Sequence, residues 1–274
     1  MVEIGTLHIF SMTRPIITLT TDFGESDHFV GAMKGVILSI RPQAQIVDIS
    51  HQIPPFSVPE AGFVIAEAAP WFPKKTIHVV VVDPGVGSAR RPILVEAAGQ
   101  YFLGPDNGVF SMIRARSPRN KVREITNRKW MLPRVSRTFH GRDVFAPAAA
   151  HLAGARSAAA AGKLVRDALQ LRLALPEQTN KRTWTGAVIR VDHFGNLITN
   201  FEAQAFPQIR TSPFEVSIGF EKIHRLALHY AECPPGELFL IEGSSGYFEI
   251  CLNQGHAART LGCSTGAPVE ITIW

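Results

Sequence analysis

The chain has 274 residues, 46% of them hydrophobic, and a formal net charge of +5 at pH 7. That length is enough to bury a sizeable core and indicates two domains, and the composition is that of an ordinary globular protein. Because acidic residues are spread among the basic ones, the positive charge does not indicate nucleic acid as a partner.

The sequence shows no sign of a membrane protein or an exported one. No apolar run reaches the roughly 18 to 20 uncharged residues that a membrane helix needs. Residues 1–11 lack the basic and the long apolar segments of a signal peptide, so we expect a cytoplasmic protein, with Met12 as an alternative natural start. The three cysteines, Cys233, Cys251 and Cys263, have no C-x-x-C spacing, which argues against a disulfide framework and a zinc site.

The first part of the chain alternates β-rich and helical patterns. Strands are expected at residues 16–20, 46–49 and 77–82, and helices at residues 29–40, 59–69 and, in an alanine-rich stretch, 146–161. This alternation predicts a Rossmann-like α/β domain with a mainly parallel sheet. Ligands of such sheets bind at the carboxyl ends of the strands, where we expect Asp22, Asp48 and Asp83. Three carboxylates at three strand ends predict a site.

The second part of the chain has the pattern of a smaller all-β domain. Residues 171–182 have the composition of a linker, which indicates a boundary near residue 180 and domains over residues 14–178 and 184–274. Beyond the boundary, short strands separated by Gly, Pro and Asn turns are expected at residues 186–191, 214–218, 238–242, 248–252 and 269–273. This pattern predicts a small β-barrel, with a sandwich as the alternative.

Four segments carry chemically useful groups, and each also has a purely structural interpretation. Asp22, between the first strand and its helix, suits the diol of a sugar but also the cap of that helix. Asp83 precedes a Gly-rich loop that ends at Arg90, and the pair suits a ligand or only closes a tight turn. His140 is compatible with both kinds of role. Residues 192–196 suit a purine and a polar tail, or form a simple turn.

Taken in order, six segments of the sequence resemble one family. They are TTDFG (residues 20–24), VDPGVG (82–87), GPDNG (104–108), FHGRD (139–143), DHFGN (192–196) and EGSSGYFEI (242–250). From Ile16 onward the chain thereby resembles the S-adenosylmethionine (SAM) hydrolases that form adenosine. These enzymes are also called SAM hydroxide adenosyltransferases and are relatives of the fluorinases and chlorinases.

The resemblance implies a reaction and its catalytic residues. Water would attack the ribose C5′ carbon of SAM and release adenosine and L-methionine, without a cofactor or a metal. The family's catalytic Asp, Arg and His fall on Asp83, Arg90 and His140. Halide-using relatives carry a tyrosine in place of the carboxylate, a halide-binding serine in place of Gly141, and an extra loop after the Gly-rich segment. Because a carboxylate repels halide but accepts a hydrogen bond from water, these differences predict water as the nucleophile.

The resemblance also implies how the substrate is held. The implied substrate-binding residues are Asp22, Asp27, Phe56, Asp192, Phe194, Asn196, Tyr230, Ser244, Ser245, Asn253 and Ala258. Asp22 and Phe56 of the first domain would contact the ribose, and residues of the second domain would bind the adenine and the methionine carboxylate. The ammonium group of methionine would be bound by Asp27 of the first domain and Asp192 of the second. In the family this site lies between the first domain of one subunit and the second domain of a neighbour, which implies a homotrimer.

Two other functions remain open on the sequence. Five side chains, Asp22, Asp48, Asp83, Asp106 and His140, suit a metal-dependent phosphoesterase if they cluster around a cation. A SAM-binding sensor without turnover would use the same pocket but has no evident need for the catalytic trio. A halogenase is disfavoured by the differences at the carboxylate and at Gly141.

Overall fold

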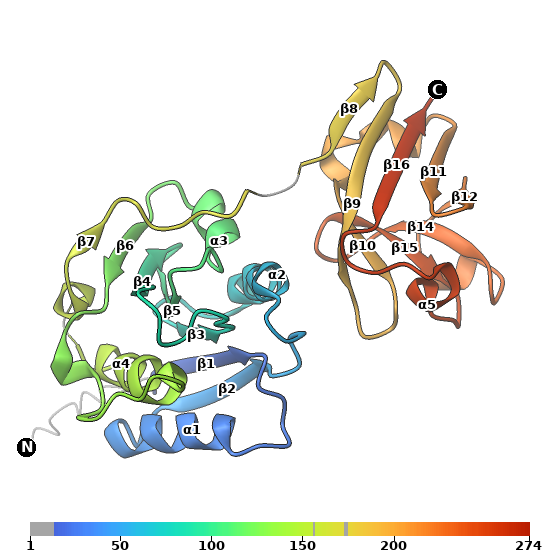
Figure 1. Ribbon diagram of the computed structural model, residues 1–274. Coiled ribbons are helices and arrows are strands. Elements are labelled where there is room, and N and C mark those ends of the chain that lie inside the picture. Colours follow the sequence, from blue (N-terminus) through green and yellow to red (C-terminus); the bar gives the residue numbers. More distant parts are fainter. Residues whose placement is uncertain (1–13, 156, 173–174) are drawn as a thin grey trace, which may run out of the picture. The chain divides into compact units, whose positions relative to one another are not determined.

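The computed structural model describes residues 14–155, 157–172 and 175–274 (Figure 1). The two expectations about the N-terminus, no signal peptide and Met12 as an alternative start, concern residues outside this part of the chain. Within the described ranges, no helix is long and apolar enough to cross a membrane. The chain divides into two compact units, the first ending at Arg172 and the second running from Leu173 to Trp274.

The first unit is built on a seven-stranded sheet with the strand order β2-β1-β3-β5-β4-β6-β7. Its strands are β1 (Ile16–Thr21), β2 (Gln45–Ser50), β3 (Ile77–Val81), β4 (Pro92–Ala97), β5 (Gln100–Pro105), β6 (Lys121–Glu124) and β7 (Leu164–Val165). The helices are α1 (Phe29–Ile40), α2 (Val58–Ala68), α3 (Ser111–Arg116) and α4 (Ala146–Leu152). The three predicted strands and the first two predicted helices are therefore confirmed, within one residue at each end.

The prediction of a mainly parallel sheet is correct for only half of the sheet. The pairs β1–β2, β1–β3 and β3–β5 are parallel, whereas β4–β5, β4–β6 and β6–β7 are antiparallel. The reversal begins at Ala98 and Gly99, which both have positive φ and join β4 to β5. A two-residue turn of this kind makes a hairpin, so the strands that it joins must run antiparallel.

Helices cover both faces of this sheet. Val30, Met33 and Ile37 of α1 are buried at helical spacing and join one core together with α4. Residues of α2 and α3 fill a second core on the opposite face. The predicted helix over residues 146–161 is wrong beyond Leu152, because Gly154 lies against the Arg41 guanidinium and residues 158–161 form a separate 3-10 turn capped by Ser157.

The second unit is a curled sheet of nine strands with the order β12-β11-β16-β9-β10-β15-β14-β13, with β8 paired to β9 (Figure 1). The strands are β8 (Glu177–Asn180), β9 (Thr183–Val191), β10 (Leu197–Glu202), β11 (Phe214–Ile218), β12 (Glu221–Ile223), β13 (Leu226–Ala227), β14 (Leu238–Glu242), β15 (Tyr247–Leu252) and β16 (Pro268–Ile273). One short helix, α5 (Ala257–Leu261), follows β15. Every pair except β13–β14 is antiparallel.

Alternation of buried and partly exposed residues explains these strands. In β11, Phe214, Val216 and Ile218 are buried and enter the core, while the residues between them are partly exposed. All five strands expected in this part of the chain are present, although β9 begins three residues earlier than expected. The segment expected to be a linker contains β8, which pairs with the early part of β9.

Candidate active site

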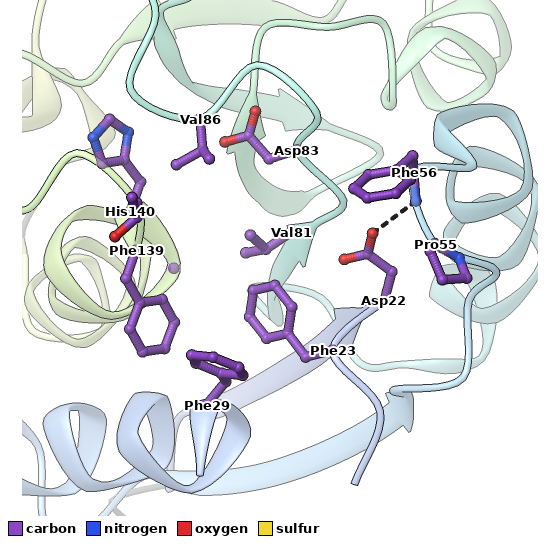
Figure 2. Close-up of a pocket in the computed structure, with 12 residues that line it drawn as sticks. Asp22, Phe23, Phe29, Pro55, Phe56, Val81, Asp83, Val86, Phe139 and His140 are labelled. Carbon is purple, nitrogen blue, oxygen red and sulfur yellow. Dashed lines mark hydrogen bonds between the residues drawn. The ribbon is translucent and has the colours of Figure 1, made fainter. Parts of the chain in front are cut away.

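A cavity of about 330 Å³ opens in the first unit where β1 and β3 end (Figure 2). Its lining residues are Asp22, Phe23, Phe29, Pro55, Phe56, Val81, Asp83, Val86, Thr138, Phe139, His140 and Gly141. Asp22 follows the last residue of β1, and Asp83 lies two residues beyond the last residue of β3. Because β1 and β3 are parallel neighbours, both carboxylates reach the same edge of the sheet.

Arg90 connects two polar side chains that line the cavity, Asp83 and His140. Arg90 Nε donates to Asp83 Oδ1 at 3.0 Å, and Arg90 Nη2 donates to Asp83 Oδ2 and also to His140 Nδ1, the latter at 2.8 Å. The side chains of Arg90 and Asp83 are only 9% and 5% exposed. The Arg90 guanidinium also lies over the Phe145 ring, 5.4 Å from its centroid. The structure therefore brings Asp83, Arg90 and His140 together, with Asp83 and Arg90 buried and His140 half-buried.

The contact with Arg90 decides the protonation of His140. A guanidinium can only donate, so His140 Nδ1 must accept and its ring proton must lie on Nε2. Burial, and then the positive charge of Arg90, hold the pKa of His140 below its ordinary value. A neutral imidazole with its N–H at Nε2 can donate a hydrogen bond to a ligand in the cavity.

Two unusual backbone segments hold this group. Gly87 has φ +78°, and a Cβ there would lie 2.2 Å from the carbonyl oxygen of Arg137. The Gly-rich turn thus packs directly against the segment that leads to His140. After His140, residues 141–145 form a π-helical turn, a feature that often marks functional sites. The buried Asp143 accepts from Ser136 N at 2.8 Å and so ties this turn to the preceding loop.

Aromatic rings form one wall of the cavity, next to the polar group (Figure 2). Phe139 packs edge-to-face on Phe23 and Phe29, with ring centroids 5.9 and 5.2 Å away. At Gly141 an added Cβ would approach Met33 Sδ to 3.1 Å and Phe139 Cε2 to 3.3 Å. The wall therefore has little room for a side chain at residue 141. Phe23, Phe29 and Phe139 were not among the predicted site residues, although Phe23 and Phe139 lie inside the motifs TTDFG and FHGRD.

Asp22 and Phe56 lie on the other side of the cavity. Phe56 N donates to Asp22 Oδ2 at 2.9 Å, and Figure 2 shows the two side chains next to one another. Phe56 has φ +67°, which is costly for a residue with a side chain, and its ring is 70% exposed. Backbone strain of this kind is frequent in ligand sites. Asp22 does not cap α1, whose N-terminal cap is His28 and makes no side-chain hydrogen bond to the helix.

The third strand-end carboxylate of the prediction, Asp48, is not part of the cavity. It lies within β2 rather than after it and binds Lys34 Nζ at 2.5 Å and His51 Nε2 at 3.1 Å. Asp106 is likewise engaged elsewhere, with Arg91 Nη2 at 2.7 Å. Within the described ranges, no three His, Cys, Asp or Glu side chains come together in a group that could hold a metal. The five side chains that a metal-dependent phosphoesterase would need therefore do not converge.

In the second unit, Asp192 organises the turn between β9 and β10. Its Oδ1 accepts from Phe194 N at 2.9 Å and from Asn196 N at 2.8 Å, and its Oδ2 accepts from Asn196 Nδ2 at 2.9 Å. Asn196 Nδ2 also contacts the Tyr230 hydroxyl at 3.4 Å. The turn leaves the Phe194 ring 72% exposed. Hydrogen bonds thus link Asp192, Phe194, Asn196 and Tyr230 into one group at this turn.

Tyr230 and Asn253 border a second hollow of about 580 Å³. Asn253 Nδ2 donates to the Cys233 carbonyl at 2.5 Å, and Ala258 N donates to the Gly195 carbonyl at 2.9 Å. Ser244 and Ser245 lie on the turn between β14 and β15, where Ser244 is exposed and Ser245 is half-buried. Asp27 is exposed in the loop before α1 and does not line the first cavity. Ala258 thus lies in α5, the serines, Asn253 and Asp27 lie outside the helices and strands, and Asp27 is not part of the first cavity.

A hydrogen-bonded Asp–Arg–His group at the carboxyl ends of parallel strands, on a cavity with an aromatic wall, defines an α/β enzyme with a candidate acid–base site. The chain belongs to the SAM hydroxide adenosyltransferase family: its residues 17–162 match the N-terminal domain of that family and residues 186–270 match the C-terminal domain. The resemblance seen in the sequence motifs is thereby confirmed.

Individual relatives agree with this assignment. A Salinispora tropica protein named (R)-S-adenosyl-L-methionine hydrolase is 37% identical over 94% of this chain and 98% of its own length. A more distant relative named fluorinase, from an Actinoplanes species, is 26% identical over 94% of this chain and 98% of its own length. The crystal structure of an uncharacterized conserved protein from Thermotoga maritima superimposes with a TM-score of 0.87 at 36% identity, over 93% of this chain and 99% of that one.

Proposed function

We propose that this protein is an enzyme that hydrolyses SAM with water at the ribose C5′ carbon and releases adenosine and L-methionine. The observation that carries the proposal is the Asp83 carboxylate, held by Arg90 beside His140 in the cavity of the first unit. A carboxylate at the nucleophile position suits water and disfavours halide. The relatives with 34–37% identity over nearly the full chain carry the name of SAM hydrolases.

In the proposed mechanism, Asp83 positions the water and receives its proton. A carboxylate offers about four acceptor positions, so the two hydrogen bonds from Arg90 leave others for a water molecule in the cavity. Arg90 holds the carboxylate in one orientation, and the Nε2–H of His140 can donate to the oxygen of the same water. Holding water in line with the bond to be broken supplies part of the rate enhancement by itself.

The leaving group of the reaction does not need to be protonated by an acid. A C5′–O bond forms between water and the ribose while the C5′–S bond breaks, and the electron pair of that bond stays on sulfur. The positively charged sulfonium becomes the neutral thioether of methionine. One proton of the attacking water is released, first to Asp83 and then to solvent. The protein therefore needs only a base and a pocket that aligns the water with SAM. Asp83 is the proposed base, and the cavity that it lines is the proposed pocket.

The substrate contacts proposed for the other residues follow the family resemblance. Asp22 and Phe56 would hold the ribose, and Tyr230, Phe194 and Asn196 would hold the adenine with backbone groups at Asn253 and Ala258. Ser244 and Ser245 would bind the methionine carboxylate, and Asp27 and Asp192 its ammonium group. No cofactor or metal takes part. The exposed rings of Phe194 and Phe56 support this proposal, because large apolar side chains on a surface frequently mark binding sites.

The proposal also covers the domain architecture, the oligomeric state and the cellular location of the protein. We propose a Rossmann-like first domain over residues 14–178, a barrel domain over residues 184–274, and a cytoplasmic homotrimer in which the second domain completes the substrate site of a neighbouring subunit. The three parallel strand pairs support the first of these and the curl of the second sheet supports the second. The trimer rests on the family resemblance, and its test is the mass of the purified protein in solution.

Product analysis tests the proposed function against its alternatives. Purified protein is incubated with the (R) and (S) sulfonium epimers of SAM, since the relatives are named for the (R) epimer, and the products are separated by chromatography. From the epimer that the protein cleaves, we expect adenosine and methionine in equal amounts. The rate should be the same with EDTA, without it, and with added chloride or fluoride. A 5′-halogenated nucleoside would indicate a halogenase, loss of turnover in EDTA a metal enzyme, and tight binding without turnover a sensor.

A further inference from the structure

Glu249 is a buried acidic side chain to which the proposed reaction gives no role. It lies in β15 and is only 7% exposed. Its neighbours Phe248 and Ile250 enter the main core of the second unit, so Glu249 points to the opposite face of the strand, together with Cys251. Among the described residues, Glu249 accepts no hydrogen bond and joins no ion pair. Its carboxyl oxygens are not among the fully enclosed polar atoms, so a ligand with hydrogen-bond donors can reach them and offset the cost of their burial.

The carboxyl of Glu249 reaches the turn that carries Ser244 and Ser245. A Cβ added at Gly243 would lie 1.8 Å from Glu249 Oε1, so the carboxyl occupies the space that this glycine leaves at the start of the turn. Across the sheet, Glu249 is in register with Ile198 of β10 and Ile241 of β14, which are both apolar. Its immediate sheet neighbours therefore supply no partner for the carboxyl.

The charged group that acts most on Glu249 is the Asp192 carboxylate. Burial, and then the negative charge of Asp192, raise the pKa of Glu249 to about 7. Burial is also the main cause of the raised pKa values of Tyr230 and Cys251, to which Glu249 contributes. Arg190 of β9 lies in the same cross-strand row as Glu249, with Ile198 between them, and its Nη1 is buried without a hydrogen-bond partner. Within the described ranges it nevertheless forms no ion pair with Glu249 or Asp192. Both carboxyl groups are thus without a direct ion pair in that part of the chain.

We propose that Glu249 is a further substrate-binding residue, which together with Asp192 receives the α-ammonium group of SAM. This inference rests on the proposed function. SAM has two positive groups, but a sulfonium has no hydrogen to donate, whereas an ammonium group has three N–H donors for carboxylate oxygens. The sulfonium is also bonded to C5′, which the mechanism places at Asp83. A metal is a poorer occupant, since no group of three possible ligands occurs among the described residues.

The proposal predicts how substrate binding responds to pH. Without substrate, Glu249 is half protonated near pH 7, and the ammonium group stabilises its charged form. The affinity for SAM is therefore high above the pKa of free Glu249 and falls as the pH drops through it. Between about pH 7.5, where the α-amino group of SAM is still largely protonated, and about pH 5.5, we expect the KM of the wild type to rise about tenfold or more.

The test compares wild type, Glu249→Gln and the control Glu242→Gln, which changes an exposed glutamate at the other side of the same turn. We expect Glu249→Gln to raise KM about tenfold at about pH 7.5 with kcat within about twofold, to abolish the rise of KM at low pH, and to cleave a desamino analogue of SAM as well as wild type does. The control should behave like wild type throughout. Equal KM values and equal pH profiles for wild type and Glu249→Gln would overturn the inference.

Calorimetry separates this inference from the proposed function. Binding of SAM is measured in an Asp83→Asn background, in which cleavage is slow, so that neither the heat of cleavage nor the proton that it releases enters the signal. The ratio of dissociation constants with and without Glu249→Gln then decides the role of Glu249, even if the wild type binds SAM without cleaving it and so contradicts the hydrolase. If the variant with Glu249→Gln does not fold, the Asp83→Asn protein alone decides. At pH near 7 it should release about half a proton per SAM bound, seen as a dependence of the heat on the buffer. Binding without proton release would contradict the proposal.

Discussion

Replacing Asp83 with asparagine is expected to lower kcat for SAM cleavage about a thousandfold, the usual scale for loss of a positioned base. The amide has the same size but cannot take a proton from water at neutral pH, and it cannot pair with the charge of Arg90. Because Arg90 also donates to His140, the substitution would also disturb the orientation of the Arg90 and His140 side chains. The measurement is the single-turnover rate of adenosine formation, which reports the chemical step without product release.

The matched control is Asp106→Asn. Asp106 is a buried aspartate that also pairs with an arginine, Arg91, but it lies outside the cavity. Losing that pair should cost stability while the rate of the chemical step in the folded protein changes little. If the two variants lose activity to the same extent, the loss in Asp83→Asn reflects a disturbed fold, and the catalytic role proposed for Asp83 is wrong.

Replacing Gly87 with alanine is expected to destabilise the first unit by about 2 kcal/mol or more, because a residue with a side chain would be forced into a left-handed backbone conformation and into overlap with a neighbouring carbonyl group. Gly87 has φ +78°, and the new Cβ would lie 2.2 Å from the Arg137 carbonyl oxygen. Relief of this clash requires the Gly-rich turn and the segment before His140 to separate. Urea unfolding followed by circular dichroism measures the loss, and the activity of the folded fraction should fall with it.

Gly85 offers a control in the same turn. Its φ lies outside the left-handed region, and an added Cβ would be 3.4 Å from Ser88 Oγ and 3.5 Å from Arg90 Cγ, which are ordinary contacts. Gly85→Ala should therefore unfold at nearly the wild-type urea concentration. Equal destabilisation by the two substitutions would show that the close approach of Gly87 to Arg137 is not what holds the turn in place.

The strands that position the candidate site could be predicted from the sequence because local pattern and tertiary role agree there. β1 and β3 are short apolar runs, and each is followed by an aspartate that lines the cavity. Asp48 shows the limit of this reasoning. It also accompanies an apolar run, but Lys34 of α1 and His51 compete for its carboxylate within β2. Which of the three aspartates line the cavity depends on such partners from other elements, and the pattern of a single strand does not predict them.

Other features depend on geometry that no local pattern predicts. The antiparallel half of the first sheet follows from the turn at Ala98 and Gly99, where an alanine takes an unusual positive φ. The neutral state of His140 follows from Arg90, which is fifty positions away in the chain. In Glu249 the sequence is misleading, because a glutamate between Phe248 and Ile250 is typical of a solvent-facing position, yet the turn at Gly243 covers it.

In the proposed reaction, water attacks the C5′ carbon of SAM in the cavity that contains Asp83. The most direct test is to let the wild type cleave SAM in ¹⁸O-labelled water and to determine by mass spectrometry which product carries the label. We expect one labelled oxygen in adenosine, at the 5′-hydroxyl, and none in methionine. Unlabelled adenosine, or label in a fragment of the amino acid, would contradict attack by water at C5′ and with it the role assigned to Asp83.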